Sequence, residues 1–130
     1  MNLCDTDWVI DLLKGRAEAE RLIHPMIAGG LALSVISVGE IYQGITYGKD
    51  PEWNERQFDE LLDRVIVVGP DVATMRIYAT IRGQLHATGM PIGDNDVLIA
   101  ATALRHDLTL VTRNRRHFER IPDLQLHEMA

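Results

Sequence analysis

The sequence predicts a three-layer α/β/α fold with a four- to five-stranded parallel sheet in the middle layer. Short apolar runs alternate along the chain with longer segments of helical periodicity, which is the pattern of parallel strands joined by crossover helices. The apolar runs are almost continuous, as expected for strands that helices cover on both faces. Gly and Pro separate the segments, where loops are needed.

Four strands are expected, and a short fifth strand would extend one edge of the sheet. The four main strands cover residues 2–4, 31–34, 65–68 and 108–112, and the edge strand covers residues 124–126. The run from Val65 to Val68 is the clearest, because all of its residues are β-branched.

Six segments have the spacing of amphipathic or buried helices. They cover residues 8–13, 17–27, 37–48, 53–63, 71–85 and 94–104. Ser37 and Glu40 match a Ser-x-x-Glu capping box, which would begin the third helix, and Asp94 would cap the sixth. Trp8 and Trp53 have core spacing in their helices and are expected to be packing residues.

Size and composition indicate one globular domain spanning residues 1–130. No apolar stretch approaches the roughly 20 residues that a membrane span needs, and Asp5 and Asp7 interrupt any secretory signal pattern. The single cysteine, Cys4, excludes an intramolecular disulfide and favours a reducing compartment. We therefore expect a cytoplasmic protein with no membrane partner.

The charges are unevenly distributed along the chain. A formal net charge of −6 argues against a surface that coats nucleic acid generally. Arginines nevertheless gather in the last third, where Arg113, Arg115 and Arg116 could contact a phosphate backbone beside an acidic pocket. The alternative is that this run is only a solvated face.

Acidic and polar residues stand at four separate places where an apolar segment gives way to a turn or a helix start. These places are Asp5-Thr6-Asp7, Glu40, Asp94-Asn95-Asp96 and Thr112-Arg113-Asn114. In parallel sheets, ligands bind beyond the carboxyl ends of the strands, so the topology would bring these residues to one edge. Converging carboxylates without lysines favour a divalent cation, and oxygen ligands suit Mg²⁺ or Mn²⁺ better than zinc.

Each of these residues also has an ordinary structural explanation. Asp94 and Asp96 could cap a helix or favour its dipole, and Glu40 could belong to the capping box. Thr112 and Asn114 could be turn formers. Convergence of several such places favours the functional interpretation.

The motifs resemble those of the PIN-domain ribonucleases, and within them the VapC-like toxins of bacterial type II toxin–antitoxin systems. Leu3–Asp7 is similar to the first acidic motif of that family and Ser37–Glu40 to the second. Pro91–Ala103 is the most specific block, and Leu108–Asn114 with Phe118 follows it. The resemblance covers practically the whole chain.

This resemblance implies a site and a reaction. It implies that Asp5, Glu40 and Asp96 hold Mg²⁺ (or Mn²⁺) and are catalytic together with Asn114, which stands where many relatives carry a fourth acid. Thr6, Asp94 and Thr112 would support them. The implied activity is hydrolysis of RNA phosphodiesters by a metal-activated water.

The resemblance also implies partners. A toxin of this type would be held inactive by a cognate antitoxin protein and would form a homodimer. The apolar helices between Ile36 and Leu62 are the candidates for the antitoxin groove and for part of the dimer contact. The RNA target stays open.

Two other functions remain to be compared with this one. Asp5-Thr6-Asp7 also matches the Asp-x-Asp pair of haloacid-dehalogenase-like phosphatases, but these need a lysine near the later acids, and the only lysines are Lys14 and Lys49. The third hypothesis is a PIN-like binding module that has the acidic pocket but catalyses no reaction.

Overall fold

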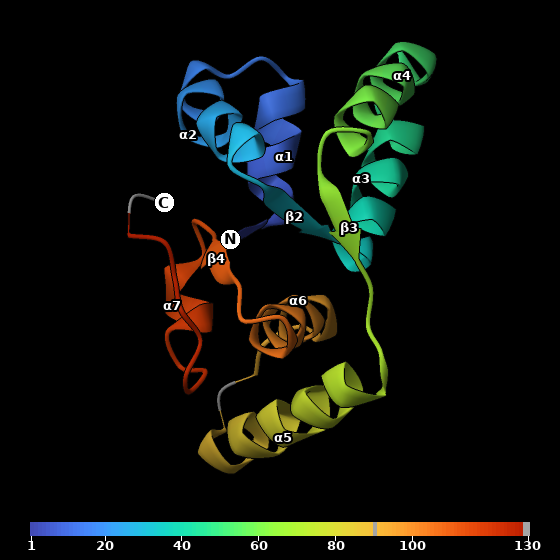
Figure 1. Ribbon diagram of the computed structural model, residues 1–130. Helices are drawn as coiled ribbons and strands as arrows, with labels where there is room; N and C mark the ends of the chain where they lie inside the picture. The colour runs from blue at the N-terminus through green and yellow to red at the C-terminus, as the bar shows by residue number, and fades with distance from the viewer. Residues whose placement is uncertain (90, 129–130) are drawn as a thin grey trace.

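Four short parallel strands form the centre of the fold, and helices cover both faces of the sheet (Figure 1). The computed structural model describes residues 1–89 and 91–128. The strands are β1 (Asn2–Cys4), β2 (Leu31–Ser34), β3 (Ile66–Val68) and β4 (Thr109–Val111). The helices are α1 (Thr6–Leu13), α2 (Ala17–Ala28), α3 (Val35–Tyr47), α4 (Pro51–Leu62), α5 (Val72–Thr88), α6 (Asp94–Arg105) and α7 (Arg115–Phe118). The fold class expected from the sequence is confirmed.

The sheet order is β3-β2-β1-β4, and all three pairings are parallel. In the centre, Leu3 of β1 lies opposite Ala32 of β2 and Leu110 of β4. The chain runs past the end of β1 with one further bond, in which the Asp5 amide donates to the Val111 carbonyl at 2.9 Å. The residues that follow β1 and β4 therefore lie side by side at the carboxyl edge.

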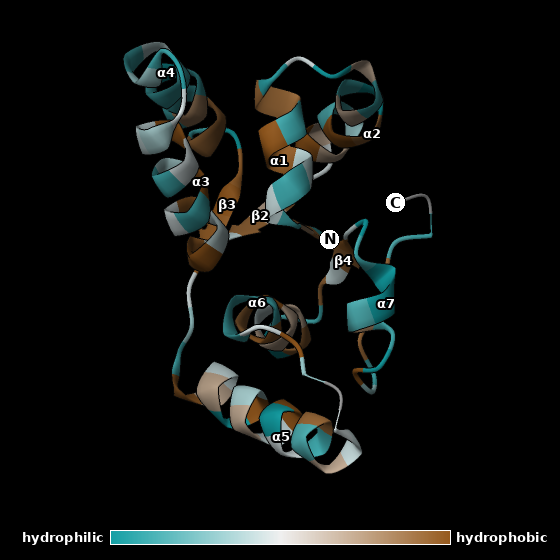
Figure 2. Cartoon of the chain, turned by 180° about the vertical axis from the view of Figure 1, so that it is seen from behind, coloured by the Kyte–Doolittle hydropathy of each residue, from teal (hydrophilic) through white to brown (hydrophobic). Residues whose placement is uncertain are grey.

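The two faces of the sheet carry separate hydrophobic clusters. Side chains alternate between the faces of a strand, so Leu3 points into the cluster with α5, α6 and α7, and Cys4 points into the cluster with α1, α2 and α4. Figure 2 shows these two groups of helices on opposite sides of the strands. Cys4 is fully buried, and burial raises the pKa of its thiol, so it is an unreactive core residue.

Helix α3 begins earlier than its sequence pattern predicts. Ser34, the last residue of β2, has extended backbone angles, and its hydroxyl accepts from the Ile36 amide at 3.1 Å. Because Ser34 already caps the helix, the predicted capping box of Ser37 and Glu40 is wrong. Ser37 lies in the first turn of the helix and Glu40 in the second, and both side chains are free for other contacts.

Three other expectations need correction. Asp94 is the first residue of α6, and the N-cap position belongs to Gly93, which has no side chain to donate or accept. Trp53 is 47% exposed, because α4 buries Phe58 and Leu61 on its other side. Residues 124–126 make only an isolated bridge from Leu126 to Leu110, so the described residues form four strands.

Asp71 begins α5 and joins it to α6. Its carboxylate accepts from the Thr74 amide at 2.8 Å in a reciprocal capping box, and Arg105 of α6 lies 3.0 Å from it. The Thr74 hydrogen bonds and the Arg105 guanidinium hold the pKa of Asp71 well below its usual range.

Within the described residues, no helix is both long and apolar enough to cross a membrane.

Candidate functional site

A cavity of about 450 Å³ opens at the carboxyl edge of the sheet, where the acidic segments meet. Four carboxylates and three amide side chains line it: Asp5, Asp7, Glu40, Asp96, Gln43, Asn95 and Asn114. They come from the end of β1, from α1, from α3, from the first turn of α6 and from the loop after β4. The convergence expected from the sequence is therefore present.

Asp5 is the most buried of these acids, with 7% of its surface exposed. Its Oδ1 accepts from the Thr6 amide at 2.8 Å, and its Oδ2 accepts from the Thr112 hydroxyl at 2.6 Å. Burial raises the pKa of Asp5, the two hydrogen bonds oppose this rise, and the nearby charges of Asp96 and Asp7 add to it. A cation beside Asp5 would offset both causes that raise its pKa.

Glu40 reaches the same cavity through a contact with α1. Its Oε1 lies 2.9 Å from the Thr6 hydroxyl oxygen, which lies 2.8 Å from the hydroxyl oxygen of buried Ser37. A carboxylate can only accept and a hydroxyl carries one proton, so Thr6 donates to Glu40 and accepts from Ser37. Ser37 thus supports the site, a role that the capping-box interpretation hid.

Asp96 and Asn114 are linked by a histidine that the sequence reasoning did not select. His117 Nδ1 lies 2.7 Å from Asn114 Nδ2 and 3.5 Å from Asp96 Oδ2. One sequence signal could have found it, because His117 stands three residues after Asn114, at the spacing that places two residues on one face of a helix.

Asp94 and Thr112 do not line the cavity. Asp94 lies outside it, where it accepts from the Tyr78 hydroxyl at 3.1 Å and pairs with Arg82 at 3.3 Å. Thr112 lies behind Asp5 and also accepts from the Asn114 amide at 3.0 Å. It therefore holds the carboxylate and the loop at the same time.

The three arginines expected at an RNA surface differ in their surroundings. Arg113 contacts Trp8, Asp11 and Glu18. Arg115 donates to the His127 carbonyl at 2.8 Å and lies 3.6 Å from Glu119. Arg116 is exposed, and its side chain has no hydrogen bond or ion pair with any residue in the described ranges.

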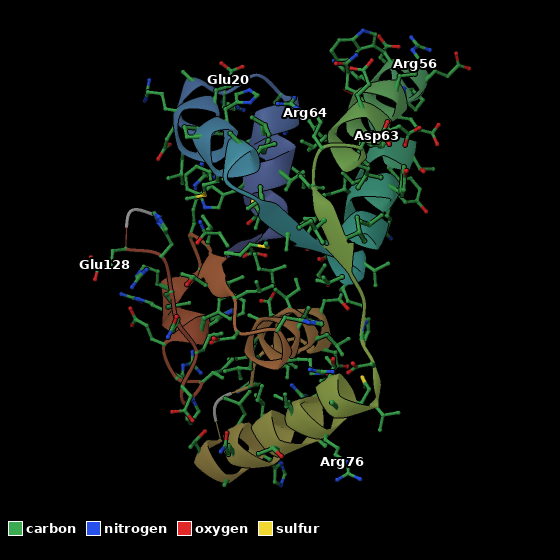
Figure 3. All side chains as sticks on the ribbon, in the orientation of Figure 1. Glu20, Arg56, Asp63, Arg64, Arg76 and Glu128 are labelled. Carbon is green, nitrogen blue, oxygen red and sulfur yellow. The ribbon has the colours of Figure 1, made fainter. Side chains whose placement is uncertain are left out.

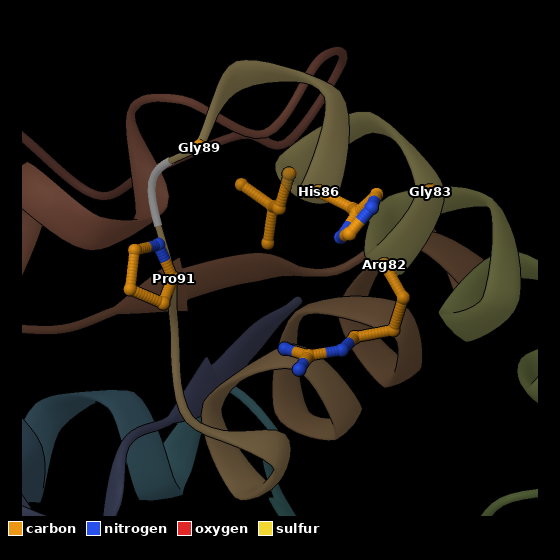
Figure 4. A pocket seen from close by; sticks show the side chains of 6 residues that line it. Arg82, Gly83, His86, Gly89 and Pro91 are labelled. Carbon is orange, nitrogen blue, oxygen red and sulfur yellow. The ribbon is translucent and has the colours of Figure 1, made fainter.

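A larger cavity, of about 580 Å³, lies at the carboxyl end of α5 and beneath the segment that leads to α6 (Figure 4). Arg82, His86 and Pro91 line it, and none of the described lining residues is acidic. Arg82 also donates to the Ile92 carbonyl at 2.6 Å. The described side chains that line this larger cavity do not provide the carboxylate and amide oxygens that line the acidic cavity.

The lining of the acidic cavity fits a hard divalent cation. Its carboxylate and amide oxygens are the ligands that Mg²⁺ and Mn²⁺ prefer, and no lysine or arginine among the described residues lines it. In the same residues, no group of three or more Asp, Glu, His or Cys side chains is arranged so that it could hold an ion alone. Mg²⁺ usually keeps several waters and binds through one or two carboxylates, which Asp5 and Asp96 can supply.

Thr112→Val tests the support of Asp5. The valine keeps the shape but removes the hydroxyl that donates to Asp5 Oδ2, and loss of such a partner typically weakens metal binding by about 10–100-fold. We expect a loss of this size in Mn²⁺ affinity, measured by titration calorimetry. Thr112→Ser keeps the hydroxyl and should retain the affinity; equal weakening in both variants would assign the effect to packing.

Comparisons with known proteins identify a family that the sequence matches. The family model described as PIN domain matches residues 3–124. Ribonuclease VapC1 of Haemophilus influenzae (strain R2866) is 34% identical over 125 residues, which are 95% of this chain and 93% of that protein. The tRNA(fMet)-specific endonuclease VapC of Shigella flexneri is 28% identical over 98% of this chain and 97% of that protein.

The fold has a similar counterpart among solved structures. The crystal structure of VapBC2 from Rickettsia felis, bound to a DNA fragment from their promoter, superposes with a TM-score of 0.89 and 28% identity. The superposition covers 97% of this chain and 96% of the other chain. The likeness therefore extends over nearly the full length of both chains.

Proposed function

This chain belongs to the PIN-domain family, and we propose that it is a metal-dependent endoribonuclease that acts as the toxin of a type II toxin–antitoxin pair. The observation that carries this proposal is the single cavity lined by Asp5, Glu40, Asp96 and Asn114, residues from four separate segments. Relatives of nearly the same length are named as ribonucleases and as a tRNA endonuclease.

The acids of the cavity have a simple electrostatic role. Without a cation they would repel a phosphate, since no basic side chain among the described residues lines the cavity. Asp5 and Asp96 would hold Mg²⁺ or Mn²⁺, which would supply an activated water and neutralise charge on the phosphoryl oxygens. The hydrogen bonds from Thr112 and from the Thr6 amide hold Asp5 in one orientation and favour its charged form.

The remaining polar residues would orient the reactants. Glu40, held by Thr6, faces the same cavity and can accept a proton or a hydrogen bond from water as a third acid of the site. Asn114, held near His117, brings an amide without charge, so it would orient water or RNA more than it would hold a cation.

The RNA would approach across α7. Arg116 is the exposed cation next to the site and would contact a phosphate, while Arg115 would contribute only by exchanging its present partners. A single-stranded loop can bring one phosphodiester into a cavity of this size more easily than a duplex can. Because one relative is named as tRNA(fMet)-specific, tRNA is the first substrate class to test.

Two apolar surfaces would serve the protein partners. A cavity of about 480 Å³ between α1, α3 and α4, lined by Ile10, Leu13, Ile41 and Ile45, adjoins the acidic cavity and would accept an apolar antitoxin segment. Exposed apolar side chains on the edge strand β3 and in the first turns of α3 and α5 would lie in a homodimer contact: Val35, Ile66, Val67, Val72 and Met75.

The experiment compares RNA cleavage by the purified chain, free of antitoxin, in Mg²⁺, in Mn²⁺ and in excess EDTA. We expect cleavage of tRNA in both metals and none in EDTA. Lack of cleavage of tRNA, ribosomal RNA and messenger RNA in both metals would leave only a PIN-like binding module.

An aryl phosphate substrate separates the phosphatase from the nuclease. We expect no release of the aryl group, since Lys14 and Lys49 line the apolar cavity and are not among the residues that line the acidic one. Rapid release, with RNA left intact, would favour the haloacid-dehalogenase-like chemistry.

The substrate class and the buried free Cys4 are consistent with action in the cytoplasm.

A further inference from the structure

Arg113 stands between two residues of the site, Thr112 and Asn114, but its own side chain is directed to the outer part of α1. Its guanidinium carbon lies 3.7 Å from the centre of the Trp8 ring. One terminal nitrogen pairs with Asp11 of α1, and the other lies 3.7 Å from Glu18 of α2. One side chain thus joins the loop after β4 to two helices.

The contact with Trp8 covers a buried ring that has no polar anchor of its own. Trp8 is 2% exposed, and its indole Nε1 has no hydrogen-bond partner among the described residues. A planar guanidinium over an aromatic face is favourable both as a cation–π contact and through stacking. Arg113 therefore completes the packing around Trp8.

The positive charge of Arg113 is already paired with two carboxylates. Asp11 and Glu18 both face its guanidinium, and only 37% of the Arg113 side chain is exposed. A phosphate would have to compete with two carboxylates and with the Trp8 ring for the same group. Arg116, three residues later, is exposed and is not engaged in this way.

The loop after β4 is consequently attached to α1 at two points. Thr112 holds Asp5 at the start of the helix, and Arg113 holds Trp8 and Asp11 further along it. Asp5 and Asp11 are six residues apart, which corresponds to about 9 Å along a helix axis. Two attachments at that separation prevent the loop from pivoting about the Thr112–Asp5 bond.

We propose that Arg113 is a positioning residue for the acidic site, and not a phosphate contact: it clamps the loop 112–114 against α1 and so keeps Thr112 on Asp5. This inference rests on the proposed role of the cavity as a cation site. It replaces, for Arg113 alone, the RNA contact expected from the arginine-rich sequence.

The sign of one measurement separates positioning from electrostatics. Loss of a positive charge near an acidic cavity should strengthen cation binding if only Coulomb forces act. Loss of a clamp should weaken it, because Asp5 would no longer be held. For Arg113→Gln we expect Mn²⁺ binding to weaken by about tenfold, at the lower end of what outer partners of metal ligands contribute.

The experiment titrates Mn²⁺ into the RNA-free protein and follows unbound Mn²⁺ by electron paramagnetic resonance. Arg116→Gln is the matched control, because it removes the same charge from an exposed neighbour; it should bind Mn²⁺ at least as tightly as the unchanged protein. Arg64→Gln, in the turn between α4 and β3 at the opposite end of the molecule from α5 (Figure 3), is the distant control. Unchanged or tighter Mn²⁺ binding by Arg113→Gln, or equal weakening by Arg116→Gln, would overturn the inference.

Two further variants secure the conclusion. Arg113→Lys keeps the charge but loses the planar fork, so it should also weaken Mn²⁺ binding; it serves in place of Arg113→Gln if the glutamine variant does not fold. In a Thr112→Val background, Arg113→Gln should cause little further loss of Mn²⁺ affinity, since both changes remove the same restraint, the Thr112 hydrogen bond that fixes the Asp5 carboxylate. Full additivity would mean that Arg113 does not act through Thr112.

Failure of this inference is distinct from failure of the proposed function. If the unchanged protein binds no Mn²⁺, the cation site itself is wrong. If it binds Mn²⁺ and Arg113→Gln binds it equally well, only the clamp is wrong.

Discussion

Asp5→Asn is expected to lower kcat/KM for RNA cleavage by at least about 1,000-fold and to leave the fold intact. A charge that holds a catalytic cation contributes several kcal/mol to the transition state, and roughly 4 kcal/mol corresponds to this factor. The amide has the same shape and keeps one oxygen that can accept from Thr112 or from the Thr6 amide. The loss would therefore come from the missing charge.

The measurement is steady-state cleavage of a fluorescent RNA in Mg²⁺, with circular dichroism to verify folding. Asp63→Asn is the matched control, because it makes the same change at an exposed position at the end of α4 and should retain full activity. If Asp5→Asn kept more than about a tenth of the activity, Asp5 could not be a principal cation ligand.

Phe118→Ala should produce the largest loss of stability, about 3–5 kcal/mol in the free energy of unfolding. Phe118 is completely buried and belongs to the same core cluster as Leu110 of β4 and Ile99 of α6. Its removal would leave a cavity under α7, and typical domains are only about 5–15 kcal/mol stable. Urea unfolding followed by circular dichroism measures the change.

The controls for this prediction separate cavity formation from general sensitivity to substitution. Phe118→Leu fills part of the space and should cost clearly less than alanine. Trp53→Ala removes a larger aromatic group from the exposed side of α4 and should cost much less than Phe118→Ala. A change below about 1 kcal/mol for Phe118→Ala would mean that α7 is not packed on the core.

Much of the fold could be predicted because its signals are local. Strand β3 lies inside the β-branched run from Val65 to Val68, and Gly48 and Pro51 stand where α3 ends and α4 begins. The prediction of an edge strand at residues 124–126 was wrong, because only Leu126 forms a bridge with β4. The prediction that Trp53 packs in the core was also wrong. Helical spacing does not decide which side of α4 is buried when apolar residues occur on more than one side, and the structure buries Phe58 and Leu61.

Capping shows where local rules stop. Ser34 and Ser37 are both suitable N-cap residues, and the sequence pattern favoured Ser37 because Glu40 follows it. The helix begins at the first of the two, since β2 ends in an extended residue whose hydroxyl already meets the Ile36 amide. Only the path of the chain out of the sheet decides between them.

By itself, the sequence determined the alternation of four strands with the first six helices, though not the short α7, and the edge at which Asp5, Glu40, Asp96 and Asn114 would meet, because apolar periodicity and parallel topology depend on neighbouring residues. Tertiary structure alone decided how side chains contact one another around this site: the Thr112 hydroxyl donates to Asp5 across 107 residues, buried Ser37 meets the Thr6 hydroxyl, and the Arg113 guanidinium lies over the Trp8 ring. Such contacts depend on how distant elements pack and on which charges are already paired, and no pattern of neighbouring residues contains that information.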